Sequence, residues 1–111
     1  MGTLARADEM VAELGALGVR AYIDPSLVNA PCVLIIPPNL TWDQMCAMSA
    51  RWQLVAMAPA ASVAERGSWE ILEGIVDNVA KVVDCHDAQL VAYTVNGKQY
   101  PSYIITFQES I

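Results

Sequence analysis

The sequence predicts an α+β fold in which two helices pack on one face of a mainly antiparallel sheet of four to five strands. Apolar residues recur at intervals of three and four in two segments, one near the N-terminus and one after residue 65. Between and after these segments lie short runs of β-favouring residues, bounded by Pro, Gly and Asn. The predicted order is therefore helix, three strands, helix, two strands. Without a repeat or a linker, the 111 residues are expected to form one domain, 1–111.

The first helix is predicted from its apolar spacing. The apolar positions are Leu4, Ala7, Val11, Leu14 and Leu17, with charged residues between them. Such an amphipathic stripe packs on a core. Gly15 and Gly18 can adopt the left-handed conformation that ends a helix, so the helix is expected to close there. Residues 21–23 then form a short strand, and residues 24–31 form a loop.

A second strand is expected over residues 32–36, an unbroken apolar run that suits burial on both faces. Pro31, Pro37 and Pro38 flank this run. Because proline cannot donate to a ladder, they are expected to stop strand pairing at each end. Residues 51–57 predict a third strand. Its alternation would place Trp52, Leu54 and Ala56 on one side and Gln53, Val55 and Met57 on the other.

The segment 40–49 between these strands allows two interpretations. It could be a helix with one apolar face, or an extended arm. Its apolar side chains are Trp42, Met45, Cys46 and Met48. Because aromatic residues and methionine are enriched at protein interfaces, these side chains are candidates for contacts with another protein. Trp42 lies near a proline-rich break and is a better interface candidate than Trp52, which is expected in the core.

A capping box and an apolar stripe predict the second helix. Ser62 and Glu65 have the spacing at which a hydroxyl and a carboxylate satisfy free amides at a helix start. The helix is expected to run to about Val83. Its buried stripe would consist of Trp69, Leu72, Ile75 or Val76, Val79 and Val83. Its opposite face would carry Arg66, Glu70, Glu73, Asp77 and Lys81. Asp77 and Lys81 have the favourable order for an ion pair.

Asn96 and Gly97 indicate a tight hairpin turn, because these residue types adopt the positive φ angles that such a turn requires. The flanking strands are expected over residues 92–95 and 98–107. Pro101 in the returning strand cannot donate to a ladder, so it is expected at a bulge or at a free edge.

Charge and hydropathy narrow the classes of partner. Six basic residues stand against twelve acidic ones, the net charge is −6, and the basic residues are isolated in sequence. A nucleic-acid surface needs clustered Lys and Arg, so binding of nucleic acid by a basic surface is not expected. The hydrophobic content of 55% and mean hydropathy of +0.35 are high for a small domain, and the spare apolar surface is expected to meet another protein.

Membrane and export segments are not expected either. No apolar run approaches the roughly 20 residues of a spanning helix. The first residues carry charges at helical spacing and do not predict a signal peptide. Cys32, Cys46 and Cys85 are odd in number and lack metal-ligand spacing, so they are expected to be reduced thiols that are dispensable for function, with Cys32 a small core residue.

The polar residues do not predict an enzyme. Cys85 and His86 are adjacent, and adjacent side chains on a strand point apart, so a nucleophile pair is not expected. Asp84, His86 and Asp87 fit no ion-binding loop of known type. Catalytic residues, metal ligands and cofactors are therefore expected to be absent.

The order of the motifs resembles that of a known family. Gly18-Val19-Arg20-Ala21 is followed by Asp24-Pro25, by Asn29-Ala30-Pro31-Cys32-Val33-Leu34-Ile35-Ile36-Pro37-Pro38, and by a Trp-containing strand that ends at Ala58-Pro59. Over residues 4–107 this pattern resembles the tail terminator, or tail-completion, proteins of long-tailed, non-contractile bacteriophages of actinobacteria. The resemblance favours an extended arm for residues 38–49.

The resemblance implies a structural virion protein at the head-proximal end of the tail, assembled in the host cytoplasm. Such proteins form a hexameric ring that caps the tail tube, terminates its polymerisation and joins it to the head connector. The implied partners are further copies of the chain, the major tail tube protein and head-closure proteins, while DNA passes through the channel without specific binding. Interface candidates are Pro38, Trp42, Met45, Met48, Tyr100 and Tyr103. Acidic candidates for the channel wall are Asp8, Glu9, Glu13, Glu70, Glu73 and Asp77.

Two alternatives stay open at this point. The first is a head-closure or adaptor subunit of the same connector. The second is a small ligand-binding or enzymatic α+β domain, in which Glu70, Glu73 and Asp77 could act as acid and base. Arg66 and Lys81 share that helical face, so an ion-paired or solvated surface is the favoured interpretation of these carboxylates.

Overall fold

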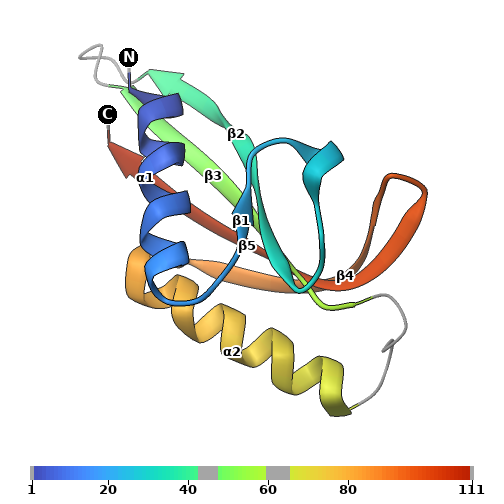
Figure 1. The fold of residues 1–111 in the computed structure, drawn as a ribbon. Coiled ribbons are helices and arrows are strands. Elements are labelled where there is room, and N and C mark those ends of the chain that lie inside the picture. The colour runs from blue at the N-terminus through green and yellow to red at the C-terminus, as the bar shows by residue number, and fades with distance from the viewer. Residues whose placement is uncertain (1, 43–47, 60–65, 111) are drawn as a thin grey trace.

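The computed structural model describes residues 2–42, 48–59 and 66–110. The elements are α1 (Thr3–Ala16), β1 (Ala21–Tyr22), the short 3₁₀ helix η1 (Pro25–Leu27), β2 (Cys32–Trp42), β3 (Met48–Met57), α2 (Arg66–Val82), β4 (Asp87–Val95) and β5 (Lys98–Ser110). Two helices pack against a five-stranded mixed sheet, which confirms the predicted α+β fold (Figure 1).

The strands are ordered β1-β2-β3-β5-β4, so the two ends of the sheet are β1 and β4. β1 runs parallel to β2, and the other neighbouring strands are antiparallel. β1 pairs only with Val33 and Leu34. Among the described residues, the outer side of β2 over residues 35–42 and the outer side of β4 therefore have no strand partner.

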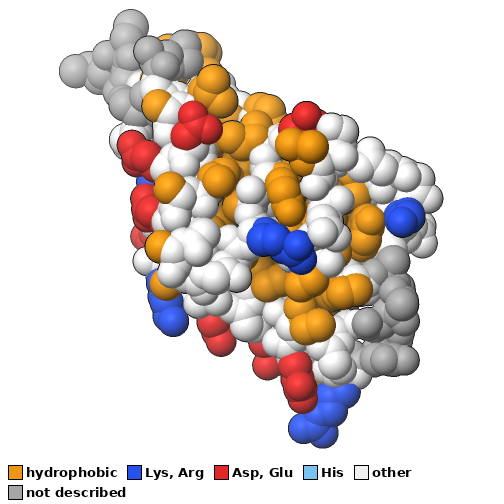
Figure 2. Space-filling view, viewed as in Figure 1, with side chains coloured by type: hydrophobic (Ala, Val, Ile, Leu, Met, Phe, Trp, Pro, Cys, Tyr) orange, Lys and Arg blue, Asp and Glu red, His pale blue; other side chains and the backbone are white. Residues whose placement is uncertain are grey.

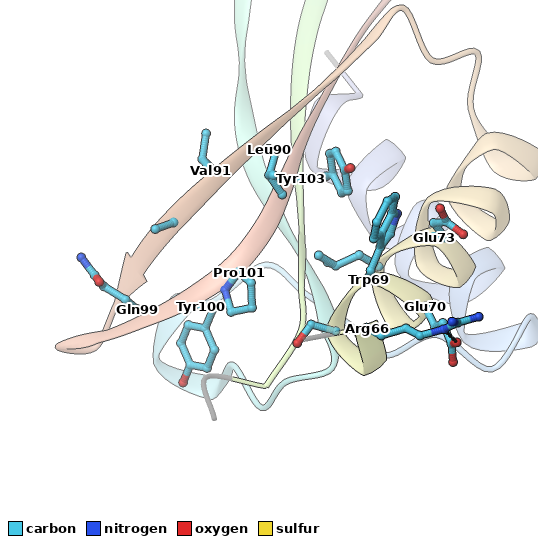
Figure 3. A pocket seen from close by; sticks show the side chains of 13 residues that line it. Arg66, Trp69, Glu70, Glu73, Leu90, Val91, Gln99, Tyr100, Pro101 and Tyr103 are labelled. Atoms are coloured by element: carbon cyan, nitrogen blue, oxygen red, sulfur yellow. Dashed lines mark hydrogen bonds and ion pairs between the residues drawn. The ribbon is translucent and has the colours of Figure 1, made fainter. Parts of the chain in front are cut away.

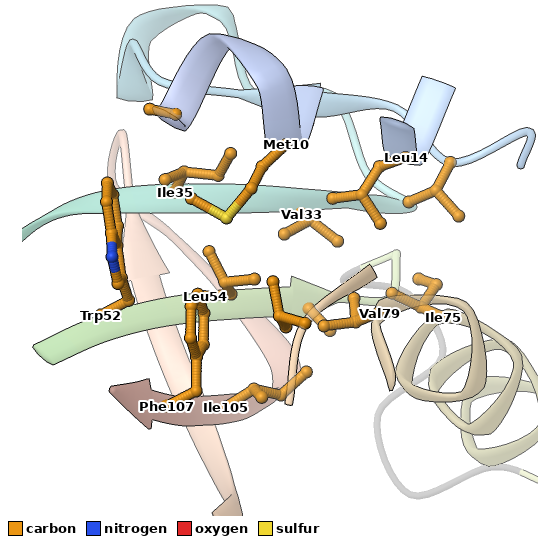
Figure 4. Close-up of a cluster of buried hydrophobic side chains, with 14 of the residues drawn as sticks. Met10, Leu14, Val33, Ile35, Trp52, Leu54, Ile75, Val79, Ile105 and Phe107 are labelled. Carbon is orange, nitrogen blue, oxygen red and sulfur yellow. The ribbon is translucent and has the colours of Figure 1, made fainter. Parts of the chain in front are cut away.

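Both helices cover the same face of the sheet (Figure 4). Met10 and Leu14 of α1 and Val79 of α2 are fully buried in this helix-side core. Trp52 and Phe107 are paired across β3 and β5, and their rings stack with centroids 6.2 Å apart. Burying a large apolar side chain contributes about 1.5–3 kcal/mol, so this layer supplies most of the stability.

The opposite face of the sheet is covered by the chain itself. A second cluster lies there, made of Cys32, Leu34, Val55, Met57 and Val95. The β4–β5 hairpin and the loop before β2 are joined above it, because Asn96 Nδ2 donates to the Pro25 carbonyl oxygen at 2.9 Å. The centre of this face is therefore not free for a partner. Trp52, Leu54 and Ala56 belong to the helix-side core, and Val55 and Met57 to this second cluster, as the alternation along β3 predicts.

The predicted register of α1 is partly wrong. The helix contacts the sheet through Ala7, Met10 and Leu14, while Leu4 and Leu17 are exposed. The buried stripe is rotated toward Met10, so Leu4 points away from the sheet and Leu17 lies past the helix end. Gly15 lies inside the helix and does not end it. Gly18 has φ +83° just after the helix, so the predicted left-handed closure there is confirmed.

The prediction that prolines end the second strand is wrong. β2 continues through Pro37 and Pro38 to Trp42, and its register against β3 shifts between Ile36 and Asn39. Both prolines lie where the outer side of β2 has no partner, and an unpaired edge with a register shift tolerates a missing N–H. Residues 37–42 and 48–51 form an extended arm, as predicted for the described part of this segment. Met45 and Cys46 lie outside the described residues.

Helix α2 confirms most of its predicted stripe. Leu72, Ile75, Val79 and Val83 are buried. The prediction that Trp69 is buried is wrong. Its side chain is 62% exposed, and Ser68 occupies the sheet-facing position instead. Residue 69 is rotated by about 100° from residue 68 around the helix, toward β4 rather than the core. The predicted capping box at 62–65 lies outside the described residues.

The hairpin turn is confirmed, although β4 begins at Asp87, five residues before the predicted start at 92. Asn96 and Gly97 have φ +52° and +77°, as a two-residue turn with two positive φ angles requires. Pairing of β5 with β3 ends at Ser102, and the next residue, Pro101, accepts from the Ala58 N–H at 3.0 Å through its carbonyl. Pro101 therefore lies where β3 has ended and no donor is needed on that side, as predicted for a free edge.

Candidate interaction surfaces

An open groove of about 980 Å³ runs between the first half of α2 and strands β4 and β5 (Figure 3). Trp69 forms one wall, while Leu90, Pro101 and Tyr103 form the floor and the opposite wall. Trp69 is 62% exposed and Leu90 is 68% exposed. The sequence leaves both side chains in water because α2 lies over the inner strands and does not reach the outer strand β4. We refer to this feature as the groove.

Strand β4 borders the groove and presents an unprotected edge. Its nine residues contain one charged side chain, Asp87, and no proline. All four residues from Asp87 to Leu90 are exposed. Natural sheet edges are usually protected by lysine, proline, bulges or covering segments, because unpaired N–H and C=O groups attract other strands. An edge without these devices is typical of a strand that a partner covers.

The second exposed apolar surface is the β2–β3 arm, residues 37–42 and 48–51. Trp42, at the end of β2, is 62% exposed, while Pro38 and Met48 are half-buried. The chain measures 48 × 25 × 25 Å, and the arm and the groove lie toward opposite ends of it (Figure 1). Arg51 is the only charged residue in the described part of the arm, it is exposed, and no described residue forms an ion pair with it.

The predicted interface residues thus separate into two surfaces. Pro38, Trp42 and Met48 belong to the arm, whereas Tyr100 and Tyr103 line the groove. Met45 lies outside the described residues. Sequence reasoning missed Trp69 and Leu90. The only signal for Leu90 was a strand with almost no charge, and its place at the sheet edge follows from the strand order, which the sequence does not reveal.

Arg6 gathers the acidic residues of α1 that were candidates for a channel wall. Its guanidinium binds Glu109 of β5 through two hydrogen bonds, Nε to Oε1 at 3.0 Å and Nη2 to Oε2 at 2.9 Å. Nη1 also lies 3.3 Å from carboxylate oxygens of Glu9 and Glu13. The hydrogen bond to Glu109 raises the pKa of Arg6. Asp8 is exposed and is the acid of this helix that has no ion pair among the described residues.

The acidic stripe of α2 is solvated. Arg66 Nε lies 3.1 Å from Glu70 Oε1, but both side chains are highly exposed and such surface pairs contribute little. Glu73 and Asp77 are exposed and form no ion pair with a described residue, and the predicted pair between Asp77 and Lys81 is not formed. In Figure 2 the acidic side chains lie mainly along the helices, at the outline of the view, while apolar side chains gather between them.

The thiols have environments that suppress their ionisation. Burial raises the pKa of Cys32, and burial together with the Asp84 carboxylate raises the pKa of Cys85. Cys85 Sγ lies 3.8 Å from the Val83 carbonyl oxygen. The backbone N–H of the neighbouring His86 donates to the Thr106 carbonyl oxygen at 2.9 Å. Because the thiolate is the nucleophilic form, Cys85 is poorly suited to covalent catalysis at neutral pH.

Within the described residues, no group of three or more His, Cys, Asp and Glu side chains could hold a metal ion. None of the described helices has the length and apolar character needed to cross a membrane. Cys32 and Cys85 are free, and Cys46 lies outside the described residues.

Comparison with known proteins gives no match: no family model, no curated protein and no solved structure resembles the chain closely enough to be assigned. The arrangement of the arm, the groove and the β4 edge is therefore the basis for a functional proposal, together with the motif order described above.

Proposed function

We propose that the chain is a structural virion protein that forms a ring, caps the tail tube of a long-tailed phage, terminates its polymerisation and joins it to the head connector. The observation that carries the proposal is the pair of exposed apolar surfaces toward opposite ends of a small acidic domain. A ring requires each copy to contact two neighbours through two different surfaces. The order of motifs, which resembles tail terminators, supplies the role in the tail.

Self-assembly also accounts for the high apolar content. Trp42, Trp69 and Leu90 are each more than half exposed, although aromatic side chains contribute most when they are buried at an interface. In a ring, contacts with two neighbours remove these side chains from water. A head-closure or adaptor subunit would use the same kinds of contact and differs in the virion partner it meets.

The charge distribution fits a channel that DNA passes through without being held. Each Lys or Arg on the wall would add a phosphate contact and strengthen binding, whereas acidic groups repel the backbone. Arg6 carries one positive charge against Glu9, Glu13 and Glu109, so that cluster stays net negative, and Asp8, Glu73 and Asp77 form no ion pair with a described residue. Assembled rings should therefore retain no duplex DNA at low salt. Retention that weakens steeply with added salt would contradict a repelling channel.

The proposal is tested with tail tubes assembled from the tube protein of a long-tailed actinobacteriophage. Addition of the purified chain should place a ring at one end of each tube and stop elongation, as seen by electron microscopy and light scattering. Leu27→Lys, in η1 and outside both surfaces, is the matched control and should cap as well as the wild type. Tubes that elongate at the same rate and carry no ring would contradict the proposal.

A second candidate, a small ligand-binding domain, is favoured by one observation. The groove, at about 980 Å³, lies within the range of small-molecule sites and has apolar and aromatic walls. It is open along its length and bordered by an unpaired strand, which suits an extended protein segment better than an enclosed ligand. A chain that stays monomeric at high concentration and binds an apolar dye in the groove would favour this candidate.

A further inference from the structure

Among the described residues, the arm and the groove each lack a partner within the chain. We propose that the arm of one copy docks into the groove and along β4 of the next copy, with Trp42 seated between Trp69 and Leu90. The occupant of the groove is therefore a second copy of this chain, joined head to tail.

The positions of the two surfaces favour this arrangement. They lie toward opposite ends of a chain that is 48 Å long, so an arm cannot reach the groove of its own copy (Figure 1). A contact between two different patches leaves one free arm and one free groove on every growing assembly. Repetition of such a contact gives a ring when the rotation closes and a filament when it does not.

The shapes and backbone groups match. The groove is large enough for an indole ring, and its walls are apolar side chains that an indole would cover. The outer edge of β4 spans about 30 Å for nine residues at the usual strand rise. The arm supplies an extended chain whose outer edge is also unpaired beyond the prolines, at residues 39–42. Pairing of these edges would satisfy backbone groups on both sides, as in the addition of a strand to a sheet edge.

The charges on the arm and the groove favour an arm-to-groove contact over an arm-to-arm or a groove-to-groove contact. Arg51 on the arm has no ion pair with a described residue. The charged residues that line the groove are Arg66, Glu70 and Glu73; Arg66 and Glu70 pair with each other, and Glu73 has no ion pair with a described residue, which leaves the groove with a net negative charge. An arm placed on a groove brings opposite charges together. Two grooves or two arms placed face to face would bring like charges together, which disfavours a contact of either surface with itself.

The head-to-tail contact rests on the ring-forming part of the proposed function, but its test does not. Association is measured with the purified chain alone, without tail tubes. A chain that forms the contact and fails to cap tubes would overturn the role in the tail and leave the contact standing. A chain that caps tubes without the contact would do the reverse.

The experiment compares an arm variant, Trp42→Ala, with a groove variant, Leu90→Lys, by sedimentation velocity over a concentration series. Each should raise the dissociation constant at least about tenfold, because a central aromatic or apolar anchor carries much of the binding free energy. Leu27→Lys changes a leucine that is 63% exposed and lies outside both surfaces, and it should associate as the wild type does. Circular dichroism and thermal unfolding check that each variant is folded.

Mixing the two defective variants gives the decisive result. The arm variant keeps an intact groove and the groove variant keeps an intact arm, so an equal mixture can form one good contact and should give a dimer of about twice the 12.0 kDa chain mass. A mixture that stays monomeric overturns the proposal, as does a wild-type chain that is monomeric throughout. A monomeric wild type that binds an apolar dye, with binding lost in Leu90→Lys, would overturn it in favour of a small-molecule site.

Discussion

The two free edges of the sheet are protected in different ways. The outer edge of β2 carries Pro37 and Pro38 and a shift of register, and it continues into the arm at one end of the sheet. The outer edge of β4 has neither proline nor lysine and lies beside an apolar groove. Prolines and bulges are devices that keep an edge from pairing with other chains.

This difference indicates that the edge of β4, rather than that of β2, accepts a strand from another copy. An edge that pairs freely is a hazard in solution, and a small acidic chain that keeps one is expected to cover it after assembly. The prolines of β2 separate residues 39–42 from the strand before them, so this part of the arm can act as a short insert of defined length. β4 can then act as the receiving edge.

Trp52→Ala is expected to have the largest effect on the free energy of unfolding, because it removes a buried side chain from the sheet that connects the two edges. Trp52 is 1% exposed and stacks on Phe107 at the base of the arm. Its truncation should lower the free energy of unfolding by about 3–5 kcal/mol, measured by urea denaturation. Trp42→Ala, on the same sheet but exposed, should change it by no more than about 0.5 kcal/mol. Equal losses would mean that Trp42 also belongs to the folded core.

Gly97→Ala sharpens the comparison from the side of β4. Gly97 has φ +77° in the turn that joins β4 to β5, and a residue with a Cβ is strained in that conformation. The free energy of unfolding should fall by about 1–2 kcal/mol. Asn96 is not altered, so its hydrogen bond to Pro25 gives a second readout by NMR. An unchanged stability would show that the turn is not needed to hold β4 in place.

The double variant Pro37→Val, Pro38→Val tests the protection of β2. It gives the edge strand the backbone N–H groups that proline lacks and should increase aggregation at high concentration, measured by light scattering, while stability changes by less than about 1 kcal/mol. Ala30 and Pro31 are left unchanged as an internal reference. If aggregation stays at the wild-type level, the prolines do not protect this edge, and the comparison between the two edges fails.

The smallest effect concerns the thiol beneath the hairpin. The pKa of Cys32 is raised by burial, so the folded state disfavours its thiolate more than the unfolded state does. Its contribution to stability is therefore fully present below the unfolded pKa of about 8.5 and is lost as the pH rises above it. The difference in unfolding free energy between wild type and Cys32→Ala should shrink from pH 7 to alkaline pH. A difference that grows with pH would contradict this sign.

The sequence predicted the fold because its periodic patterns are strong. The alternation along 51–57, the stripe of Leu72, Ile75 and Val79, and the Asn96-Gly97 turn each have one dominant structural solution. Local patterns say less about how a helix is rotated on the sheet and how far a strand continues. Met10 replaced Leu4 in the buried stripe because several apolar residues of α1 compete for it, and the prolines of β2 were tolerated because no strand lies beside them.

The interaction surfaces could be predicted only in part. Trp42 was proposed for an interface because it stands outside any core pattern and Tyr100 because it lies near a proline or polar break; Trp42 is exposed and Tyr100 lines the groove, while an interface role stays a prediction. Trp69 fits a helical stripe as well as any core residue, and only the finding that α2 leaves β4 uncovered shows that its ring faces solvent. Strand order depends on contacts between residues far apart in the chain, so no local pattern reveals which strand is the edge.

The contact between the arm and β4 is tested most directly by crosslinking two single-cysteine chains, with the natural cysteines replaced. One chain carries Thr41→Cys on the arm and the other carries Gln89→Cys on the β4 edge, both at exposed positions. A short bismaleimide should join unlike chains efficiently and like chains poorly, because only the mixture places an arm cysteine beside a β4 cysteine. Leu27→Cys should crosslink to neither. Crosslinks that form equally well between like chains, or that are absent from the mixture, would contradict head-to-tail docking of the arm.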